Sequence, residues 1–164
     1  MAKVERTTTR ITGFEGAELD FQLMRSLGAA NYGGGSPGEI FHARQMIGGD
    51  DPYAWPVAFT ALAQHVEQTG EEAAQRQHAV SAREHFLRAS MYWRAAEYFS
   101  DPFRPEMQER GLACRRAFLR AAEFTRDRIT TRVFDVAEGA DMHCQVGNLP
   151  LSCAIVYDWL EEVL

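Results

Sequence analysis

Apolar side chains recur at steps of three and four along most of residues 51–126, which constrains this stretch to helices. The pattern runs through three segments, separated at Gly70 and at residues 100–105, and its members are Trp55, Phe59, Leu62, Val66, Ala82, Phe86, Ala89, Trp93, Ala96, Met107, Cys114, Phe118, Ala121 and Ala122. Side chains at this spacing share one side of a helix, so each segment can bury one face against its neighbours. We therefore expect helices over 52–70, 71–99 and 105–126.

Two shorter helices are predicted before these three. An imperfect apolar face favours a helix over 17–30, and the glycine-rich stretch 31–39 interrupts it. Ser36, followed by Pro37 and by Glu39 three residues on, is typical of a helix start with a capping box, so a helix over 37–47 is expected. The chain thus divides into a polar tail (1–16), a helical array of about five helices (17–128) and a C-terminal region (129–164).

The C-terminal region changes pattern. Residues 130–136 are β-branched, aromatic and roughly alternating, which predicts the one strand of the chain, and a final helix is expected from Asn148 to Leu164. The expected fold class is therefore mainly α, with one C-terminal strand. Because the edges of a lone strand must be paired or covered, a homodimer that pairs this strand is also expected.

Composition excludes several classes of function. The net charge is −6 and there is no Lys/Arg run, so we expect no nucleic-acid partner. No apolar run is long enough to span a bilayer, and the N-terminus is too polar for a signal-peptide core, so a cytoplasmic protein with no membrane partner is expected. Three cysteines without paired spacing indicate reduced thiols, and neither a metal site nor a cofactor is predicted.

Two segments carry a family resemblance. The first reads GGGSPGEIFHARQMIGGDDPYAWPVAFTALAQHVEQTG and continues in HAVSAREHFLRASMYWRAAEYFSDPFRP. It resembles the N-terminal helical cap of the α/β hydrolases that include 2,6-dihydroxypseudooxynicotine hydrolase and fungal polyketide-shortening hydrolases. The second is similar to the last strand, catalytic-His loop and final helix of the same enzymes, and it reads FDVAEGADMHCQVGNLPLSCAIVYDWLEEVL. In that family the nucleophile, the acidic triad member and most of the parallel sheet lie between these segments. The resemblance therefore implies an internally truncated member that lacks a complete α/β-hydrolase fold and the Ser-His-Asp mechanism.

One short motif imitates the missing nucleophile. Gly34 to Gly38 matches GxSxG with Ser36 at its centre. A nucleophile elbow requires a strand before the serine, and none is predicted there. We therefore interpret Ser36 as a helix cap.

The resemblance also suggests the candidate site residues. It places His143 at the position of the general base, with Asp141 or Glu138 close enough in sequence to orient it; the alternative is a loop histidine without a role. Because the cap helix roofs the active site in the family, further substrate-binding candidates lie on the predicted helices, and Arg88 or Tyr92 would polarise a carbonyl. These candidates are Trp55, His85, Arg88, Tyr92 and Trp93. Structural packing is the competing interpretation of each aromatic residue.

Three functions remain open. The first is a small-molecule enzyme of polyketide-like secondary metabolism, which would use non-covalent acid/base chemistry for cyclisation or C–C bond rearrangement. The second is a non-catalytic module for ligand binding or oligomerisation. The third is a remnant left by an internal deletion, and the smooth junction at 124–128 argues against it.

Overall fold

The computed structural model describes residues 13–125, 137–138 and 149–163. The first range contains α1 (Ala17–Ala29), the 3-10 turn η1 (Ala30–Tyr32), α2 (Pro37–Ile47), α3 (Ala54–Gln75), α4 (Ala79–Tyr98) and α5 (Pro105–Ala122). The helix α6 (Leu149–Val163) belongs to a separate compact unit, Arg128–Leu164, whereas α1 to α5 belong to the unit Met1–Asp127. None of the helices in the described ranges is both long and apolar enough to cross a bilayer.

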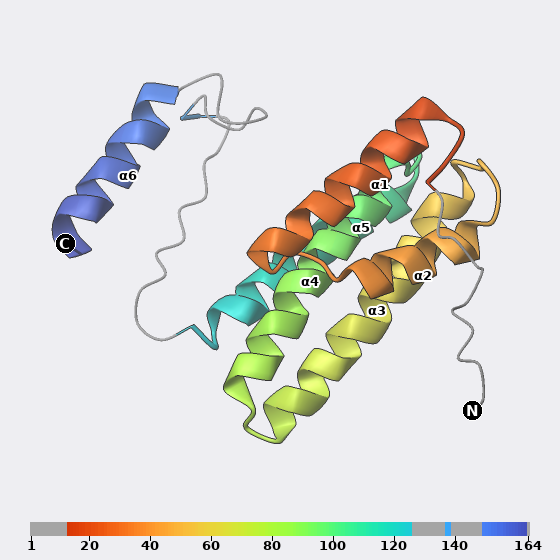
Figure 1. Cartoon of the computed structure of the whole chain (residues 1–164). Coiled ribbons are helices and arrows are strands. Elements are labelled where there is room, and N and C mark those ends of the chain that lie inside the picture. The colour runs from red at the N-terminus through yellow and green to blue at the C-terminus, as the bar shows by residue number, and fades with distance from the viewer. Residues whose placement is uncertain (1–12, 126–136, 139–148, 164) are drawn as a thin grey trace, which may run out of the picture. The chain divides into compact units, whose positions relative to one another are not determined.

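The bundle is built around the hairpin of α3 and α4. Figure 1 shows these two helices side by side, with α5 along α4 and with α1 and α2 on the other side of the hairpin. Trp55 stacks on Phe59 with ring centroids 4.4 Å apart, and the Trp55 indole N–H donates to the carbonyl of Ala95 at 2.8 Å. Small buried residues such as Ala89 and Ala96 allow the helices to approach closely around these rings. The apolar spacing in the sequence therefore corresponds to a packed core.

The predicted helix boundary at Gly70 is wrong. The helix α3 continues to Gln75, and the chain turns instead at Gln77, whose φ is +61°. Gly70 serves packing, because a Cβ at this position would lie 3.0 Å from the Phe86 ring and 3.2 Å from the Cβ of His85. The lack of a side chain at Gly70 thus allows α4 to lie close to α3. The predicted helix 71–99 is divided, because its first residues belong to α3 and most of the rest to α4.

The buried face of α5 agrees with the predicted face at Ala121 but not at Phe118. Its buried residues are Ala113, Ala117 and Ala121, while Phe118, expected to point inward, is 45% exposed. The three alanines let α5 pack closely on α4, whereas a phenylalanine in that row would hold the helices apart.

The predicted strand requires a correction of the fold class. Over the described residues the structure consists of six α-helices and one 3-10 turn and contains no strand, while residues 130–136 lie outside those ranges. The sequence pattern indicates no second strand among the described residues, so a first strand would find no partner there for its backbone hydrogen bonds. The supported class is all-α for the described part. The expected homodimer was argued from this strand, and the structure of a single chain does not test it.

Candidate functional site

A partly buried polar cluster lies where α2 begins. The backbone of Ser36 is extended and its side chain makes no capping hydrogen bond. The backbone N–H of Ser36 donates to the hydroxyl oxygen of Tyr92 at 2.7 Å, and this hydroxyl donates to Oε2 of Glu39 at 2.6 Å. In a capping box the glutamate would accept directly from the N-cap N–H. Here a phenol from α4 is inserted between the two groups.

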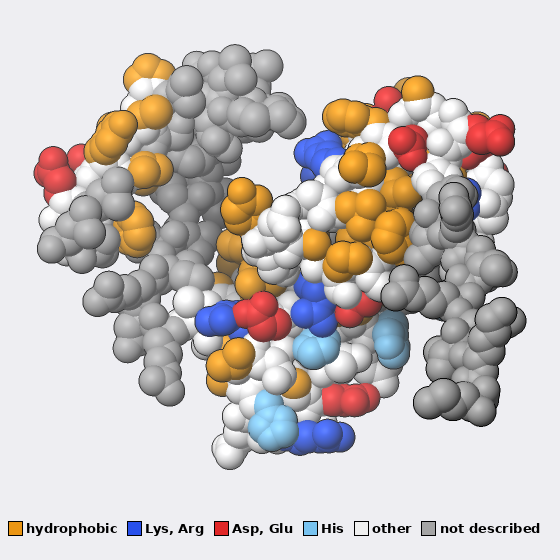
Figure 2. All heavy atoms as spheres, viewed as in Figure 1, with side chains coloured by type: hydrophobic (Ala, Val, Ile, Leu, Met, Phe, Trp, Pro, Cys, Tyr) orange, Lys and Arg blue, Asp and Glu red, His pale blue; other side chains and the backbone are white. Residues whose placement is uncertain are grey.

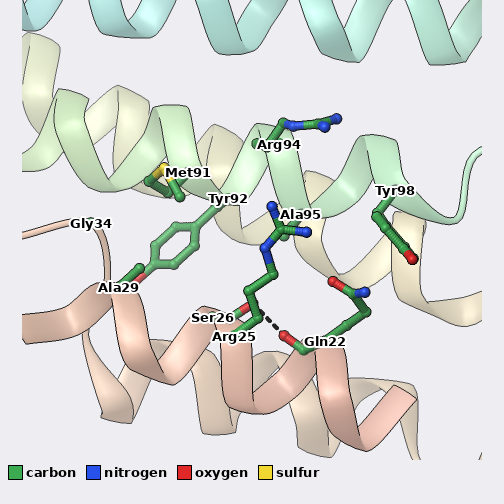
Figure 3. A pocket seen from close by; sticks show the side chains of 10 residues that line it. All are labelled: Gln22, Arg25, Ser26, Ala29, Gly34, Met91, Tyr92, Arg94, Ala95 and Tyr98. Atoms are coloured by element: carbon green, nitrogen blue, oxygen red, sulfur yellow. Dashed lines mark hydrogen bonds between the residues drawn. The ribbon is translucent and has the colours of Figure 1, made fainter. Parts of the chain in front are cut away.

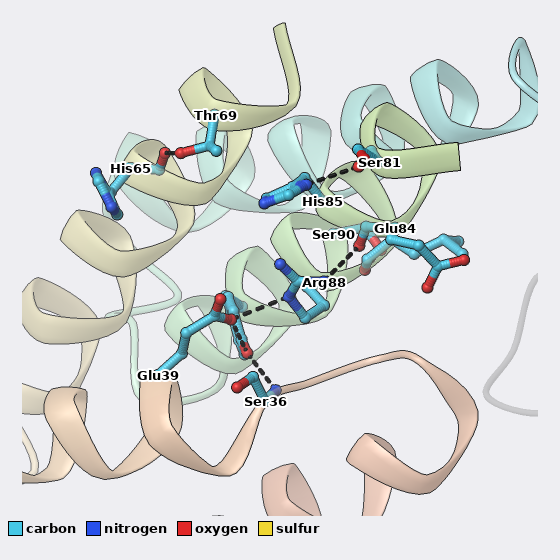
Figure 4. Close-up of polar contacts among 11 residues, drawn as sticks. Ser36, Glu39, His65, Thr69, Ser81, Glu84, His85, Arg88 and Ser90 are labelled. Atoms are coloured by element: carbon cyan, nitrogen blue, oxygen red, sulfur yellow. Dashed lines mark hydrogen bonds and ion pairs between the residues drawn. The ribbon is translucent and has the colours of Figure 1, made fainter. Parts of the chain in front are cut away.

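Arg88 completes this cluster from one turn earlier on α4. Its Nε donates to the same Glu39 oxygen at 3.1 Å, and its Nη1 donates to the carbonyl of Glu84 at 3.3 Å. Figure 4 shows Arg88 and Ser36 approaching Glu39 from α4 and from the loop before α2. The cluster therefore ties α2 to α4 through one carboxylate.

Tyr92 stays protonated in this setting. Its side chain is only 1% exposed, and burial together with the hydrogen bond to Glu39 raises the pKa of the phenol above its usual value of 10. At neutral pH the hydroxyl is therefore a donor, and its hydrogen bonds to Glu39 and Ser36 engage it fully. This arrangement braces the helices and leaves no free catalytic group on Tyr92.

The ring of Tyr92 also closes one side of a groove between α1 and α4. Figure 3 shows this groove, with side chains of α1 on one wall and side chains of α4 on the other. The lining residues are Gln22, Arg25, Ser26, Ala29, Gly34, Met91, Tyr92, Arg94, Ala95 and Tyr98. Apolar groups and a few polar ones thus share one shallow concave surface, whose cavity volume of about 50 Å³ encloses only a small part of a ligand.

Gly34 lets the loop between η1 and α2 approach this groove. A Cβ on Gly34 would lie 3.0 Å from Cγ of Met91 and 3.2 Å from the Cβ of Ala29. Any larger residue would have to displace these walls. The three consecutive glycines that interrupt the helical pattern are therefore partly explained by packing at the groove.

The end of the groove near the start of α1 is anchored by Glu18. This carboxylate accepts hydrogen bonds from Nε2 of Gln22 at 3.1 Å and from the hydroxyl of Tyr98 at 2.8 Å. The bonds from Gln22 and Tyr98 lower the pKa of Glu18, and the same contact raises the pKa of Tyr98. Glu18 is thus ionised at neutral pH, in the first turn of α1, where the helix dipole favours a negative charge.

The other predicted site residues lie apart from the Glu39 cluster. Trp55 is part of the core, and Trp93 is buried with its indole N–H donating to Oε2 of Glu67 at 2.9 Å. Trp93 lines a different groove, which it shares with Arg110 of α5. The Nδ1 of His85 lies 2.6 Å from the carbonyl of Ser81, within its own helix.

The structure therefore brings together two predicted residues, Arg88 and Tyr92. His143 and Asp141 lie outside the described residues. Glu39, which joins the two, was expected only as a capping residue, and nothing in the sequence pattern pointed to Arg25 or to the buried Gln22.

Comparison with known proteins supports the class that the sequence resembles. About half of the chain is similar to fungal proteins named as alpha/beta hydrolases, hydrolases or hydrolyases, so the resemblance is confirmed over that part. No protein-family model matches the chain.

Three relatives illustrate the match. The chain is 40% identical over 80 residues to the alpha/beta hydrolase pydG of an Acremonium species and 39% identical over 85 residues to the hydrolyase poxO of Penicillium oxalicum. It is 35% identical over 100 residues to the hydrolase ORFZ of Pyricularia oryzae. These matches cover 49%, 52% and 59% of this chain but only 19%, 20% and 24% of the relatives. The chain thus corresponds to about a fifth to a quarter of the length of these relatives.

Proposed function

We propose that this chain acts in secondary metabolism on a polyketide-like small molecule, and that the groove between α1 and α4 binds that molecule. The observation that carries the proposal is the composition of the groove. Ala29, Met91 and Ala95 supply apolar surface, while Arg25 and Tyr98 add polar groups beside it. Such a surface suits a flat, largely apolar molecule that carries a few oxygen atoms.

The similarity to fungal hydrolases and hydrolyases supports a role in small-molecule chemistry. The reaction we propose is a cyclisation or a C–C bond rearrangement by non-covalent acid/base catalysis, with His143 as the acid/base group and Asp141 as the residue that orients it. This assignment rests on the sequence, since both residues lie outside the described ranges.

Tyr92 and Arg88 receive a different role from the one expected. Polarising a substrate carbonyl would require Tyr92 to give up its bond to Glu39, and Arg88 is bound to the same carboxylate. We therefore assign both residues to bracing the groove wall.

The second candidate is a ligand-binding module without catalysis. The pairing of two of the groove's ionisable groups favours this function: Tyr98 is bound to Glu18, and Arg94 is bound to Glu97 at 2.6 Å. Both candidates bind a small molecule, and they differ in turnover.

One experiment tests the groove and a second separates the candidates. Ala29→Leu should obstruct the groove and weaken binding of an aromatic 1,3-dicarbonyl, measured by titration calorimetry, by tenfold or more, roughly 1.4 kcal/mol. Ala61→Leu is the control, because Ala61 lies on an exposed position of α3. Equal affinity of the two variants would refute the groove as the binding site.

The second experiment is a turnover assay of the His143→Ala variant. Loss of turnover with retained binding would support the enzyme, whereas binding without turnover in the unmodified chain would support the module. Turnover that survives the substitution would reject His143 as the acid/base group.

A further inference from the structure

Arg25 differs from most arginines of the bundle in lacking a partner. It has no hydrogen bond or ion pair with another of the described residues, and its side chain is exposed. Six other arginines each pair with a carboxylate: Arg83, Arg88, Arg94, Arg104, Arg116 and Arg120. Arg44 and Arg110 donate to carbonyl or hydroxyl oxygens instead. The Arg25 guanidinium is therefore available to pair with a ligand, as are the exposed Arg76 and Arg115 elsewhere on the bundle.

The charge of Arg25 is directed into the groove. Figure 3 shows the side chain of Arg25 extending from α1 toward Ala95 on α4, between Tyr92 and Gln22. The pKa of Tyr98, raised first by its hydrogen bond to Glu18, is partly lowered again by the charge of Arg25. The guanidinium thus lies within electrostatic reach of other groups in the groove.

The other two charged groups near the groove already have hydrogen-bond partners. Arg94 is paired with Glu97, and Glu18 is engaged by Gln22 and Tyr98 seven residues before Arg25 on α1. Both partners of Glu18 are neutral, so the groove has a negative group near the start of α1 and the positive guanidinium of Arg25 further along the same helix. A neutral ligand would leave this guanidinium without a counterion.

Apolar surface adjoins the guanidinium. Ala29 lies one turn after Arg25 on α1, and Ala95 and Met91 face them from α4. In the view of Figure 2, hydrophobic side chains also gather over α1, where Phe21 and Met24 are exposed. The place beside Arg25 therefore suits a molecule with an apolar body and one anionic end.

We infer that the groove selects an acidic small molecule, whose carboxylate pairs with Arg25 while its apolar body lies on Ala29, Met91 and Ala95. A guanidinium presents parallel N–H groups that match the two oxygens of a carboxylate, which gives both orientation and affinity. This inference rests on the proposed function, because it names the class of ligand for the same groove.

The test compares two ligands and three proteins by titration calorimetry. The ligands are 2-naphthoic acid and its neutral carboxamide, which share one apolar body. The proteins are the unmodified chain, Arg25→Gln, and Arg115→Gln as a matched control, since Arg115 is exposed on α5. Far-UV circular dichroism verifies that each variant is folded.

The unmodified chain and Arg115→Gln should bind the acid roughly tenfold more tightly than the carboxamide, as a charge-assisted pair predicts. Arg25→Gln should remove this preference and leave the affinity for the carboxamide unchanged. Equal affinities for both ligands in the unmodified chain, or a preference that persists in Arg25→Gln, would overturn the inference while leaving the groove as a binding site. Absence of binding by either ligand would overturn the groove proposal and this inference with it.

Discussion

Replacing Tyr92 with phenylalanine removes one oxygen atom from the centre of the cluster and leaves the buried ring in place. The hydroxyl donates to Glu39 and accepts from the backbone N–H of Ser36. A hydrogen bond to a charged group contributes about 1.5–3 kcal/mol and a neutral one about 1 kcal/mol. Glu39 keeps its bond to Arg88, and its side chain is 29% exposed, so water can replace part of the loss. We expect Tyr92→Phe to lower the free energy of unfolding by about 2 kcal/mol.

Urea denaturation followed by far-UV circular dichroism measures this change. Tyr53→Phe is the matched control: Tyr53 is 83% exposed, and the hydrogen bond that the structure shows for it uses its backbone N–H. Its loss should stay within about 0.5 kcal/mol, the usual range for surface substitutions. A Tyr92→Phe variant as stable as the control would refute the bracing role of the cluster.

Three further predictions concern the bundle itself. Phe59→Ala should lower the free energy of unfolding by about 3–5 kcal/mol, because Phe59 is fully buried and the cavity it leaves cannot close; a loss below about 1 kcal/mol in urea denaturation would contradict the packed core. Gly70→Ala should lower the free energy of unfolding by about 1 kcal/mol, because the new Cβ would crowd the Phe86 ring. Gly28→Ala should raise the free energy of unfolding by up to about 1 kcal/mol, because a Cβ there meets open space. Thermal unfolding of both variants checks that the two effects have opposite signs. A hydrogen bond from Arg120 lowers the pKa of Glu71 below 4.5, so this pair stabilises the fold above that pH, and the stabilisation is lost as the pH falls through the lower folded-state pKa. Glu71→Gln should therefore lose less stability than the unmodified chain during acid titration. An unchanged dependence of stability on pH would contradict this role of the pair.

Most helices could be predicted because their signals are local. Pro37 and Pro105 open the helices where the sequence indicated, and the apolar spacing identified the core residues of α3 and α4. The boundary at Gly70 could not be predicted, because a glycine that ends a helix and a glycine that admits a neighbouring ring look alike in sequence. Ala113 and Ala117 of α5 were missed because an alanine row indicates close packing only once the partner helix is known.

The site was predictable only in part, because its contacts join helices that lie far apart in the sequence. Tyr92 was recognisable as a polar side chain beside an apolar face and Arg88 as a group that could polarise a carbonyl, and the structure joins them through Glu39. Their partner Glu39 lies 53 residues from Tyr92, so the contact depends on how α2 packs against α4. Arg25 lies on a helix with an imperfect apolar face, and its place in the groove depends on the position of α1 over α4.

The most direct test of the groove is its location by nuclear magnetic resonance. Backbone amide shifts of the ¹⁵N-labelled chain are followed during titration with 2-naphthoic acid. We expect the largest changes at Ser26, Ala29, Gly34 and Ala95, which line the groove. Changes concentrated instead around Trp93 and the neighbouring groove on α5, or absent altogether, would contradict it.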